Sequence, residues 1–307
     1  ANDTNDTTYT ALGTFTGTCA SGTISISTSS GSFASGAVTG NYVVADTTTG
    51  DIVSPTAITP SGSSCVISVD TSRNGHSFSI IATINKTGSS GTEKSKTLNT
   101  YTQSLTTQAA ATNVILNLAK PDVWRIISVK MDSGSFSSPT GNYTIDISDR
   151  YNFDNGQRPT HYDLGRLLLK DTYVPPSGPI QIKFEYFTHS NGDYCTVNSY
   201  PSTVDYKKIP TALRDSLDFR PVINDSGTAF TSVTLLPKRG SEITVDFKYY
   251  LPRKDKVELD FQGQFFDVSG TPALIPEEPA DNSNGMVLYK LSLEPFTFGT
   301  TSDSVKV

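Results

Sequence analysis

Apolar and polar residues alternate in short runs along both halves of the chain. Between Ser77 and Ile84, for example, Phe78 and Ile80 share one parity, while Ser77 and Ser79 share the other. Successive side chains of a strand point to opposite faces, so this alternation predicts strands with one buried and one solvated face. No segment keeps a helical period over the length of a stable helix. The pattern therefore predicts an all-β protein.

The first part of the chain is expected to form an immunoglobulin-like β-sandwich, because several short strands separated by turns rich in Gly, Ser, Asn and Pro are typical of that fold. The 21 Thr and 18 Ser of the first hundred residues would also suit a disordered stalk. A stalk would lack the alternating apolar residues, and Thr is common on solvated strand faces. The predicted strands are Thr23 to Ser27, Asn41 to Ala45, Cys65 to Asp70 and Ser77 to Ile84.

The second part repeats this pattern with more aromatic residues. Gln262-Gly263 and Asn191-Gly192 predict hairpin turns in which Gly supplies a positive φ. Thr271 to Pro279 predicts an extended loop, because Pro cannot donate to a sheet. Thr211 to Leu217 predicts a single helical turn. The predicted strands are Val123 to Met131, Tyr143 to Ile147, Arg166 to Lys170, Ile180 to Phe187, Tyr194 to Tyr200, Val233 to Leu236, Glu242 to Tyr250, Val257 to Phe261, Gln264 to Val268 and Met286 to Leu293.

Composition changes near residue 110 and predicts a domain boundary there. Of the 54 charged residues, only ten lie in the first hundred residues. The Ala/Thr stretch Thr106 to Thr112, which also predicts a short helix, marks the change. We therefore expect two β-sandwich-type domains, an immunoglobulin-like one over residues 1–110 and a larger antiparallel one with long loops over residues 111–307.

The charge balance argues against a nucleic-acid-binding protein. The 24 Lys and Arg stand against 30 Asp and Glu, a net charge of −6, whereas binding to phosphates calls for a basic face. No apolar run approaches the ~18 residues that a membrane span needs, so membrane insertion is not expected. The chain begins Ala1-Asn2-Asp3 without an initiator Met, and we expect it to be a fragment of a longer protein.

Three cysteines, Cys19, Cys65 and Cys195, form no C-x-x-C pair, so a zinc site is not expected. Cys19 and Cys65 would pair if the protein matured outside a cell. Burial of all three as small apolar side chains in a reducing compartment is the favoured interpretation. No cofactor is expected.

Candidate catalytic and metal-binding groups are each weighed against a structural role. Cys195 with His189 is the only conceivable nucleophile and base, but a Cys on a strand beside a surface His on a turn is favoured. His161, Asp163, His189 and Asp193 lack the spacing of a known metal site.

Carboxylates are weighed in the same way. Glu258 and Asp260 share a strand face, as a glycosidase pair would, but their alternation with apolar residues favours the solvated face of a hairpin. Asp149, Asp154 and Asn155 with the following Gly suggest a calcium loop out of register, which an Asn-Gly turn explains equally well.

Five sequence blocks of the second part, taken in order, resemble a module of structural proteins from the virions of tailed phages. Proteins with these blocks occur in T4-like myoviruses, notably cyanophages, as baseplate, tail-fibre or unassigned virion components. The resemblance spans about residues 114–307, while residues 1–110 share only the general look of immunoglobulin-like domains on phage tails. The blocks are Arg150 to Arg158, Tyr162 to Arg166, Phe184 to His189 with Gly192 to Tyr194, Leu213 to Pro221, and Tyr249 to Lys256.

The resemblance implies a non-enzymatic structural component of a phage tail, a baseplate or tail-fibre protein assembled in the host cytoplasm. Its partners would be other virion proteins and further copies of itself. It transfers no catalytic motif, so we expect no enzymatic activity. The alternatives are an adhesin module that binds host-surface carbohydrate and, third, a depolymerase, for which a long β-helix with paired acids is missing.

Contacts with other subunits are expected at two kinds of position. The loop from Thr271 to Asn284 is stiffened by Pro and offers an apolar tip and an acidic edge. Arginines of the blocks are expected to pin loop carbonyls or to pair with aspartates, inside the protein or across a subunit joint. The predicted interface residues are Leu274, Ile275, Glu277, Glu278, Arg158, Arg214 and Arg220, and the arginines' expected partners are Asp154, Asp163, Asp215 and Asp218.

Overall fold

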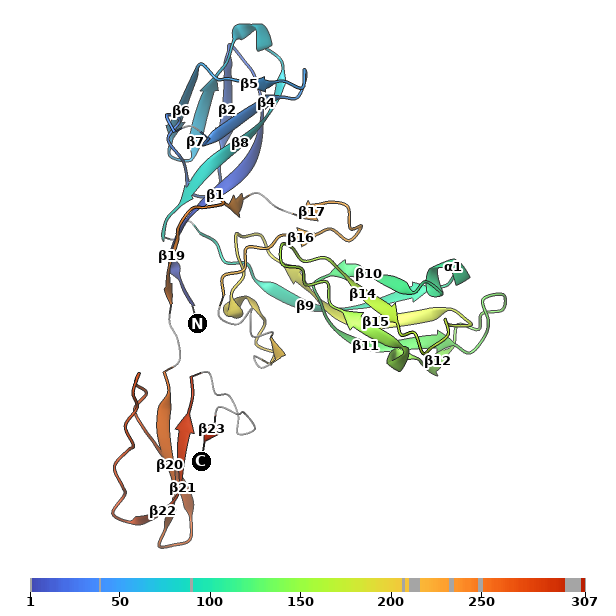
Figure 1. Ribbon diagram of the computed structural model, residues 1–307, viewed down its shortest axis with the longest axis vertical. Coiled ribbons are helices and arrows are strands. Elements are labelled where there is room, and N and C mark those ends of the chain that lie inside the picture. The colour runs from blue at the N-terminus through green and yellow to red at the C-terminus, as the bar shows by residue number, and fades with distance from the viewer. Residues whose placement is uncertain are drawn as a thin grey trace.

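The computed structural model confirms an all-β fold arranged in three lobes (Figure 1). It describes residues 2–38, 40–88, 91–205, 208–209, 216–231, 235–247, 251–295 and 305–306. Within these residues the only α-helix is α1 (Gln108–Ala111), whose first turn is capped by the Thr107 side chain. This helix lies inside the Ala/Thr stretch where the sequence predicts one.

The first lobe is a sandwich of two antiparallel sheets. One has the order β18-β1-β8-β4-β5, with β19 and β3 added beside it, and the other has the order β2-β7-β6. Alternate residues of both sheets, such as Ile24, Ile67 and Ile80, are fully buried between them. The elements of this lobe are β1 (Asn2–Thr18), β2 (Thr23–Ser27), β3 (Ser32–Phe33), β4 (Tyr42–Asp46), β5 (Ile52–Val53), β6 (Ala57–Ser61), β7 (Ser64–Ser68), η1 (Thr71–Arg73) and β8 (Ser77–Lys86).

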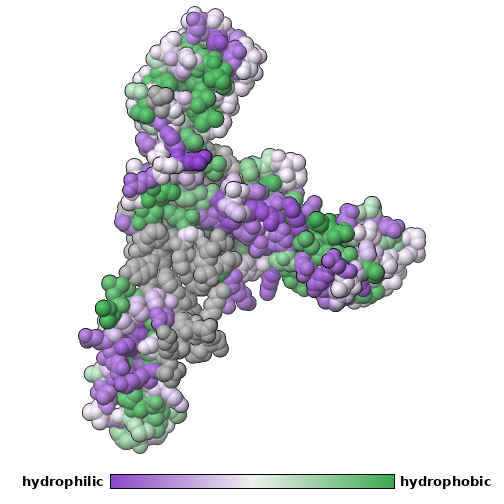
Figure 2. Space-filling model, in the orientation of Figure 1, coloured by the Kyte–Doolittle hydropathy of each residue, from purple (hydrophilic) through white to green (hydrophobic). Residues whose placement is uncertain are grey.

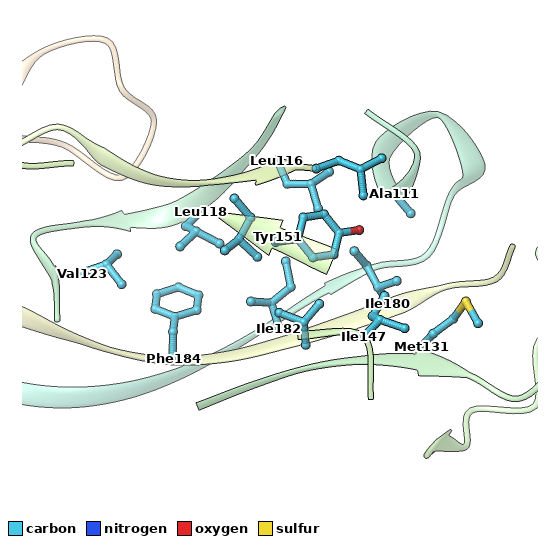
Figure 3. Close-up of a cluster of buried hydrophobic side chains, with 13 residues drawn as sticks. Ala111, Leu116, Leu118, Val123, Met131, Ile147, Tyr151, Ile180, Ile182 and Phe184 are labelled. Atoms are coloured by element: carbon cyan, nitrogen blue, oxygen red, sulfur yellow. The ribbon is translucent and has the colours of Figure 1, made fainter. Parts of the chain in front are cut away.

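The second lobe is also a sandwich, with sheet β12-β11-β15-β9 packed against sheet β10-β14-β13. Leu116 and Leu118 from one sheet meet Ile182 and Phe184 from the other in a buried core (Figure 3). Gly165 lets the sheets approach, since a Cβ there would lie 2.6 Å from Val123. The elements are β9 (Lys96–Leu105), β10 (Ile115–Pro121), β11 (Val123–Asp132), β12 (Tyr143–Asp146), η3 (Ser148–Arg150), β13 (Tyr151–Asp154), β14 (Leu164–Leu169) and β15 (Ile180–His189).

The third lobe is a single antiparallel sheet with the order β21-β20-β22-β23. The predicted hairpin at Gln262-Gly263 is confirmed, because β20 and β21 pair on either side of it and Gly263 has a φ of 80°. The Pro-rich stretch before β22 is an irregular loop, as predicted. The strands are β20 (Arg253–Asp260), β21 (Phe265–Ser269), β22 (Gly285–Leu293) and β23 (Val305–Lys306).

The first two lobes meet at a joint. Tyr9 and Ala11 of β1 pack against Tyr194, with Leu217 and Phe219 around them. Strand β1 also pairs with two strands that follow the second lobe, and the second of these leads toward the third lobe (Figure 1). The elements of the joint are η4 (Val197–Ser199), β16 (Val222–Ile223), β17 (Phe230–Thr231), β18 (Leu235–Pro237) and β19 (Ile243–Phe247).

The division between sheets differs from the expected domain boundary at residue 110. Strand β9 precedes that position, yet all ten of its residues pair with β15 of the second lobe. Strands β18 and β19 follow it, yet both pair with β1. Composition failed to mark this division because a polar edge strand such as β9 resembles the Thr-rich strands before it. The part beyond residue 110 is also divided, since β20 to β23 form their own sheet.

Two expected elements differ from the structure. Residues Tyr194 to Tyr200, predicted as a strand, contain isolated bridges and the 3-10 turn η4, because Thr196 and Ser199 form a capping box at its start. The turn at Asn191-Gly192 leads the chain to Thr92 and Lys94, not back along β15. The helical turn predicted over Thr211 to Leu217 lies largely outside the described residues.

Candidate functional site

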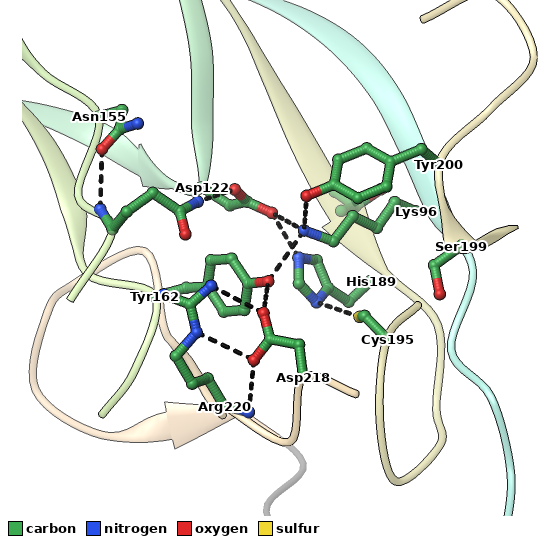
Figure 4. Close-up of polar contacts among 12 residues, drawn as sticks. Lys96, Asp122, Asn155, Tyr162, His189, Cys195, Ser199, Tyr200, Asp218 and Arg220 are labelled. Carbon is green, nitrogen blue, oxygen red and sulfur yellow. Dashed lines mark hydrogen bonds and ion pairs between the residues drawn. The ribbon is translucent and has the colours of Figure 1, made fainter. Parts of the chain in front are cut away.

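The densest cluster of ionisable groups lies at the inner end of the second lobe, where β9, the β10–β11 corner and β15 meet the loops of the joint (Figure 4). Lys96 of β9 is its centre, and its side chain is fully buried. Its Nζ donates to Asp122 Oδ2 at 2.9 Å, to Tyr162 Oη at 3.1 Å and to Tyr200 Oη at 3.2 Å. The rings of these two tyrosines also lie 4.4 and 4.5 Å from the ammonium group. Lys96 is therefore held by one carboxylate and an aromatic cage.

Asp122 occupies the corner between β10 and β11 in a left-handed conformation with a φ of 48°, which is unusual for a residue other than Gly. Its carboxylate accepts hydrogen bonds from Lys96, from His189 Nε2 at 2.6 Å and from Gln157 Nε2 at 2.6 Å. Burial raises the pKa of this carboxyl, but the charge of Lys96 and the hydrogen bond from His189 outweigh it and hold the pKa at about 2. Asp122 is thus charged in the neutral range and neutralises a buried Lys.

A second carboxylate extends the network toward β16. Tyr162 Oη donates to Asp218 Oδ2. Arg220 donates to both oxygens of Asp218, through Nε at 2.9 Å and Nη2 at 2.7 Å. Arg220 also stacks on the Tyr162 ring at 4.3 Å and donates through Nη1 to the carbonyl of Arg158 at 2.7 Å. These contacts fix the loop segments around residues 158–162 and 218–220 against each other.

Cys195 and His189, the pair considered as nucleophile and base, lie side by side with Sγ 3.8 Å from Nδ1. Because Asp122 accepts from Nε2, this nitrogen carries the proton, and Nδ1 of a neutral imidazole then accepts from the thiol. Burial lowers the pKa of His189, although Asp122 opposes this, and burial raises the pKa of Cys195 to about 11. Both shifts disfavour the thiolate and imidazolium that a cysteine nucleophile needs.

The sequence interpretation of these two residues is wrong in its structural detail. His189 has only 6% of its side chain exposed, so it is no surface residue. Cys195 forms an isolated antiparallel bridge with Asp218 and is not part of a strand. Cys195, His189 and Asp122 lie in a row, as the residues of a catalytic triad do, but the Cys195 thiol is 2% exposed and protonated. The arrangement suits a structural role better than nucleophilic chemistry.

The other cysteines are free thiols buried in the first lobe, which agrees with the interpretation as small core residues. Cys19 Sγ lies 3.5 Å from Asn74 Oδ1, and Cys65 Sγ lies 3.8 Å from Tyr42 Oη. The two cysteines are not bonded to each other in the structure.

A cavity of about 370 Å³ opens beside the network. His189 and Tyr186 form part of its wall, together with the polar side chains of Lys120, Asn191 and Asp225. It lies on the side of His189 that faces β16 and β17. A small polar molecule would fit this cavity.

The side chains weighed as metal ligands have other partners. Asp163 binds Arg166 at 2.8 Å, Asp193 binds Lys86 at 3.1 Å, and His161 stacks on Phe230. Across the described ranges, no group of three His, Cys, Asp or Glu side chains is arranged to hold a metal ion.

The suggested calcium loop is an ordinary turn. Gly156 has a φ of 78° and donates its N–H to Asp154 Oδ1 at 3.0 Å, while Asp154 also binds Arg158 through both oxygens. Asp149 lies elsewhere and accepts from Tyr173 Oη at 3.1 Å.

Glu258 contradicts the expectation of a solvated hairpin face. It shares that face with Asp260, as predicted, but its side chain is fully buried and neither oxygen has a hydrogen-bond partner within the described chain. Asp260 instead caps the hairpin turn by accepting from Gln262 and Gln264. The two carboxylates therefore do not act on a common open site.

The predicted interface residues divide into two groups. Arg158 pairs with Asp154 and Asp163, and Arg220 pairs with Asp218, so the expected Arg and Asp pairs form inside the chain. In the loop, Leu274 is 73% and Ile275 87% exposed, and Glu277 is exposed as well. Glu278 binds Lys290 of β22 at 2.8 Å, and Arg214 and Asp215 lie outside the described residues.

Lys96, Asp122, Tyr162 and Tyr200 were not singled out from the sequence. They lie far apart along the chain and form no motif, so only the topology of the sheets brings them together. An ionisable residue placed among strand-forming residues was the one available signal.

Comparisons with protein-family models, curated proteins and solved structures found no match. Among the described residues, no helix has the length and apolar character needed to cross a bilayer.

Proposed function

We propose that the chain is a non-enzymatic structural component of a tailed-phage virion, in the baseplate or tail fibre, that builds rigid β architecture and contacts other virion proteins. The observation that carries the proposal is the use of the buried network. Lys96 is paired with Asp122, and Arg220 is paired with Asp218. These pairs hold loops of the joint against the second lobe. The sequence blocks that resemble phage virion proteins supply two of these four residues, Asp218 and Arg220, as well as Tyr162 and His189 of the same network.

A biochemical assay can test directly whether the chain lacks enzymatic activity, as proposed. The purified chain is expected to leave host polysaccharide, peptidoglycan and protein intact, because the Cys195 thiol is protonated, Asp154 is paired with Arg158, and Glu258 is buried without a partner among the described residues. Turnover that is lost in Cys195→Ser, Asp154→Ala or Glu258→Gln, with the fold retained, would contradict the proposal.

The proposed location in a virion has to be tested on the phage particle itself. An antibody raised against the purified chain should label the tail of particles whose genome encodes it, as seen by immunogold electron microscopy. The chain should also remain with tails after a density gradient. Labelling of infected-cell membranes alone, with unlabelled particles, would overturn the assignment.

A host-surface adhesin is the second candidate, and the cavity beside His189 is the observation that favours it. Its wall combines the aromatic ring of Tyr186 with the polar groups of Asn191 and Asp225, and sugars are bound by stacking and hydrogen bonding together. Titration of the chain with host-surface oligosaccharides, compared with Tyr186→Ala, separates the two candidates. Binding that this variant abolishes would favour the adhesin.

A further inference from the structure

Lys94 differs from the other buried lysines of the first two lobes. Lys86 and Lys96 each pair with a buried aspartate. Lys94 is 8% exposed, yet its ammonium group forms no ion pair or hydrogen bond with any residue that the structure describes. Its backbone N–H donates to the carbonyl of Tyr194 at 2.7 Å. A largely buried charge without a partner is costly, so this lysine points to a ligand that supplies the anion.

The side chain of Lys94 forms part of the wall of the 370 Å³ cavity beside His189. The cavity lies at the inner end of the second lobe, a region that is largely hydrophilic on the face shown in Figure 2. Burial is the main cause of the lowered pKa of His189, and the charge of Lys94 adds to it, which places that charge near the cavity wall. The stem of Lys94 packs on Gly192, where a Cβ would lie 2.8 Å from Lys94 Cγ. Backbone packing therefore sets the position of this lysine.

The other charges around the cavity are already balanced. Lys120 pairs with Asp225. His189 is uncharged in the neutral range, because burial lowers its pKa, and both of its ring nitrogens have partners within the network. Lys94 therefore leaves the cavity with one uncompensated positive charge.

We propose that this cavity binds a small organic monoanion through a carboxylate that pairs with Lys94. One carboxylate balances one ammonium group, whereas a phosphate dianion would bring excess negative charge into a partly buried site. The amide of Asn191 also lines the cavity and can donate to the second carboxylate oxygen. Phe187, Val222 and Ile223 give the wall an apolar part that suits the body of such a ligand.

This inference goes beyond the proposed function, because a structural component can hold such a ligand and the test needs neither a particle nor a host. Isothermal titration calorimetry of the purified full chain compares glucuronate and benzoate, each with its uncharged counterpart, glucose or benzamide. The tighter carboxylate should bind at least about tenfold more tightly than its counterpart, the value of one hydrogen bond to a charged group. Preference for glucuronate identifies an acidic sugar as the source of the carboxylate, and preference for benzoate a hydrocarbon acid.

Lys94→Met tests the lysine, because it keeps the length of the stem and removes the charge. Carboxylate binding should weaken by about 10- to 100-fold, and binding of the uncharged counterpart should not change. Lys183→Met, which removes the same charge from an exposed position of β15, is the control and should leave carboxylate binding unchanged.

Melting temperatures guard against a misfolded variant. Because Lys94 lacks a partner, Lys94→Met without ligand should melt at or above the temperature of the wild type. The carboxylate should raise the melting temperature of the wild type only.

Four results would overturn the proposal. Neither carboxylate binds up to ~10 mM, or inorganic phosphate binds more tightly than both. Glucose or benzamide binds as tightly as its carboxylate. Lys94→Met keeps the affinity of the wild type. Lys94→Met without ligand melts well below the wild type, which would show that Lys94 has a structural role.

Discussion

Asp122 is the residue on which the buried network depends. It faces Lys96, His189 and Gln157 at once, and the Lys96 ammonium group has no other carboxylate within hydrogen-bond distance in the described chain. Asp122→Ala is expected to lower the free energy of unfolding by about 3–5 kcal/mol, the usual loss when one partner of a buried ion pair is removed. Urea denaturation followed by circular dichroism measures this change.

The matched control for Asp122 is an exposed ion pair on the same sheet. Arg125 binds Glu185 across β11 and β15, but its side chain is 59% exposed. Arg125→Ala should change the free energy of unfolding by about 0–1 kcal/mol. Equal effects of the two variants would show that burial of the network contributes nothing to stability.

His189 should make the fold sensitive to mild acid. Burial lowers its pKa from an ordinary value of 6.5, and the charged or titratable groups that face it include Asp122, Lys96, Lys94, Cys195 and Tyr162. The unfolded chain therefore binds a proton at a pH where the folded chain does not, so His189 weakens the fold as the pH falls below about 6.5. Asp122, with a pKa of about 2, removes further stability between about pH 4 and pH 2.

The pH dependence of the urea midpoint tests this expectation. The wild-type midpoint should fall between about pH 6.5 and pH 5, and the fall should be smaller in His189→Gln, which keeps a side chain able to donate to Asp122. If the urea midpoint of the variant falls with pH as steeply as that of the wild type, groups other than His189 cause the acid sensitivity.

Contacts between individual side chains are the features that the sequence alone predicted least well. The sequence predicted that arginines of the blocks pair with aspartates, and Arg158 with Asp154 and Arg220 with Asp218 are such pairs, each formed within one block. Lys96 and Asp122 are 26 positions apart and belong to different strands, so nothing in either local segment indicates the pair. Burial of Glu258 was missed because the loop that covers it follows 13 or more residues later in the chain.

Among the structural elements, the turn at Gly156 allows a sharp prediction. Gly156 and Gly141 both have positive φ, 78° and 73° respectively. A Cβ at Gly141 would meet nothing within 4 Å, whereas one at Gly156 would lie 2.2 Å from the Asp163 carbonyl oxygen. Gly141→Ala should cost about 1–2 kcal/mol from backbone strain alone.

Gly156→Ala should cost clearly more, because the backbone that holds Asp163 near Arg158 has to move as well. The difference between the two melting temperatures measures this contribution. Equal melting temperatures would contradict the close approach of the two loop segments.

The loop between β21 and β22 carries the prediction for assembly. Leu274 and Ile275 are exposed, so replacing both by Ser should leave the melting temperature nearly unchanged, while incorporation into particles should fall. Ile52→Ser, at a position that is also 73% exposed but on the first lobe, is the control for both measurements. A large loss of stability with normal incorporation would reject the loop as a contact surface.

Strands were predicted well where apolar residues alternate and poorly where small or polar residues take the inward positions. Strand β8 alternates Phe78, Ile80 and Ile84 and was found in the sequence. Strand β1 was missed because Gly13 and Gly17 occupy positions where a Cβ would lie 2.6 Å from Leu235 and Ile24. Its remaining signal was Thr at five of the six alternate positions from Thr8 to Thr18, opposite Tyr9, Ala11 and Phe15, and the two glycines interrupt that apolar parity.

At the scale of the whole molecule, two sandwiches meet at a joint beside the buried network, and a one-layered sheet follows them along the chain. The first two lobes bury their apolar faces within the chain, and the third leaves such a face open. Under the proposed structural function, the two sandwiches would supply rigidity and the third lobe would supply contacts. The partition of strands between lobes could not be deduced from the sequence, because β18 and β19 return to β1 over more than two hundred residues.

Electron cryo-microscopy of the particle tests the central claim most directly. The account predicts density for all three lobes in the tail, with the exposed loop between β21 and β22 against a neighbouring subunit. Particles whose tails contain no density for this chain, while the free protein turns over a substrate, would contradict it.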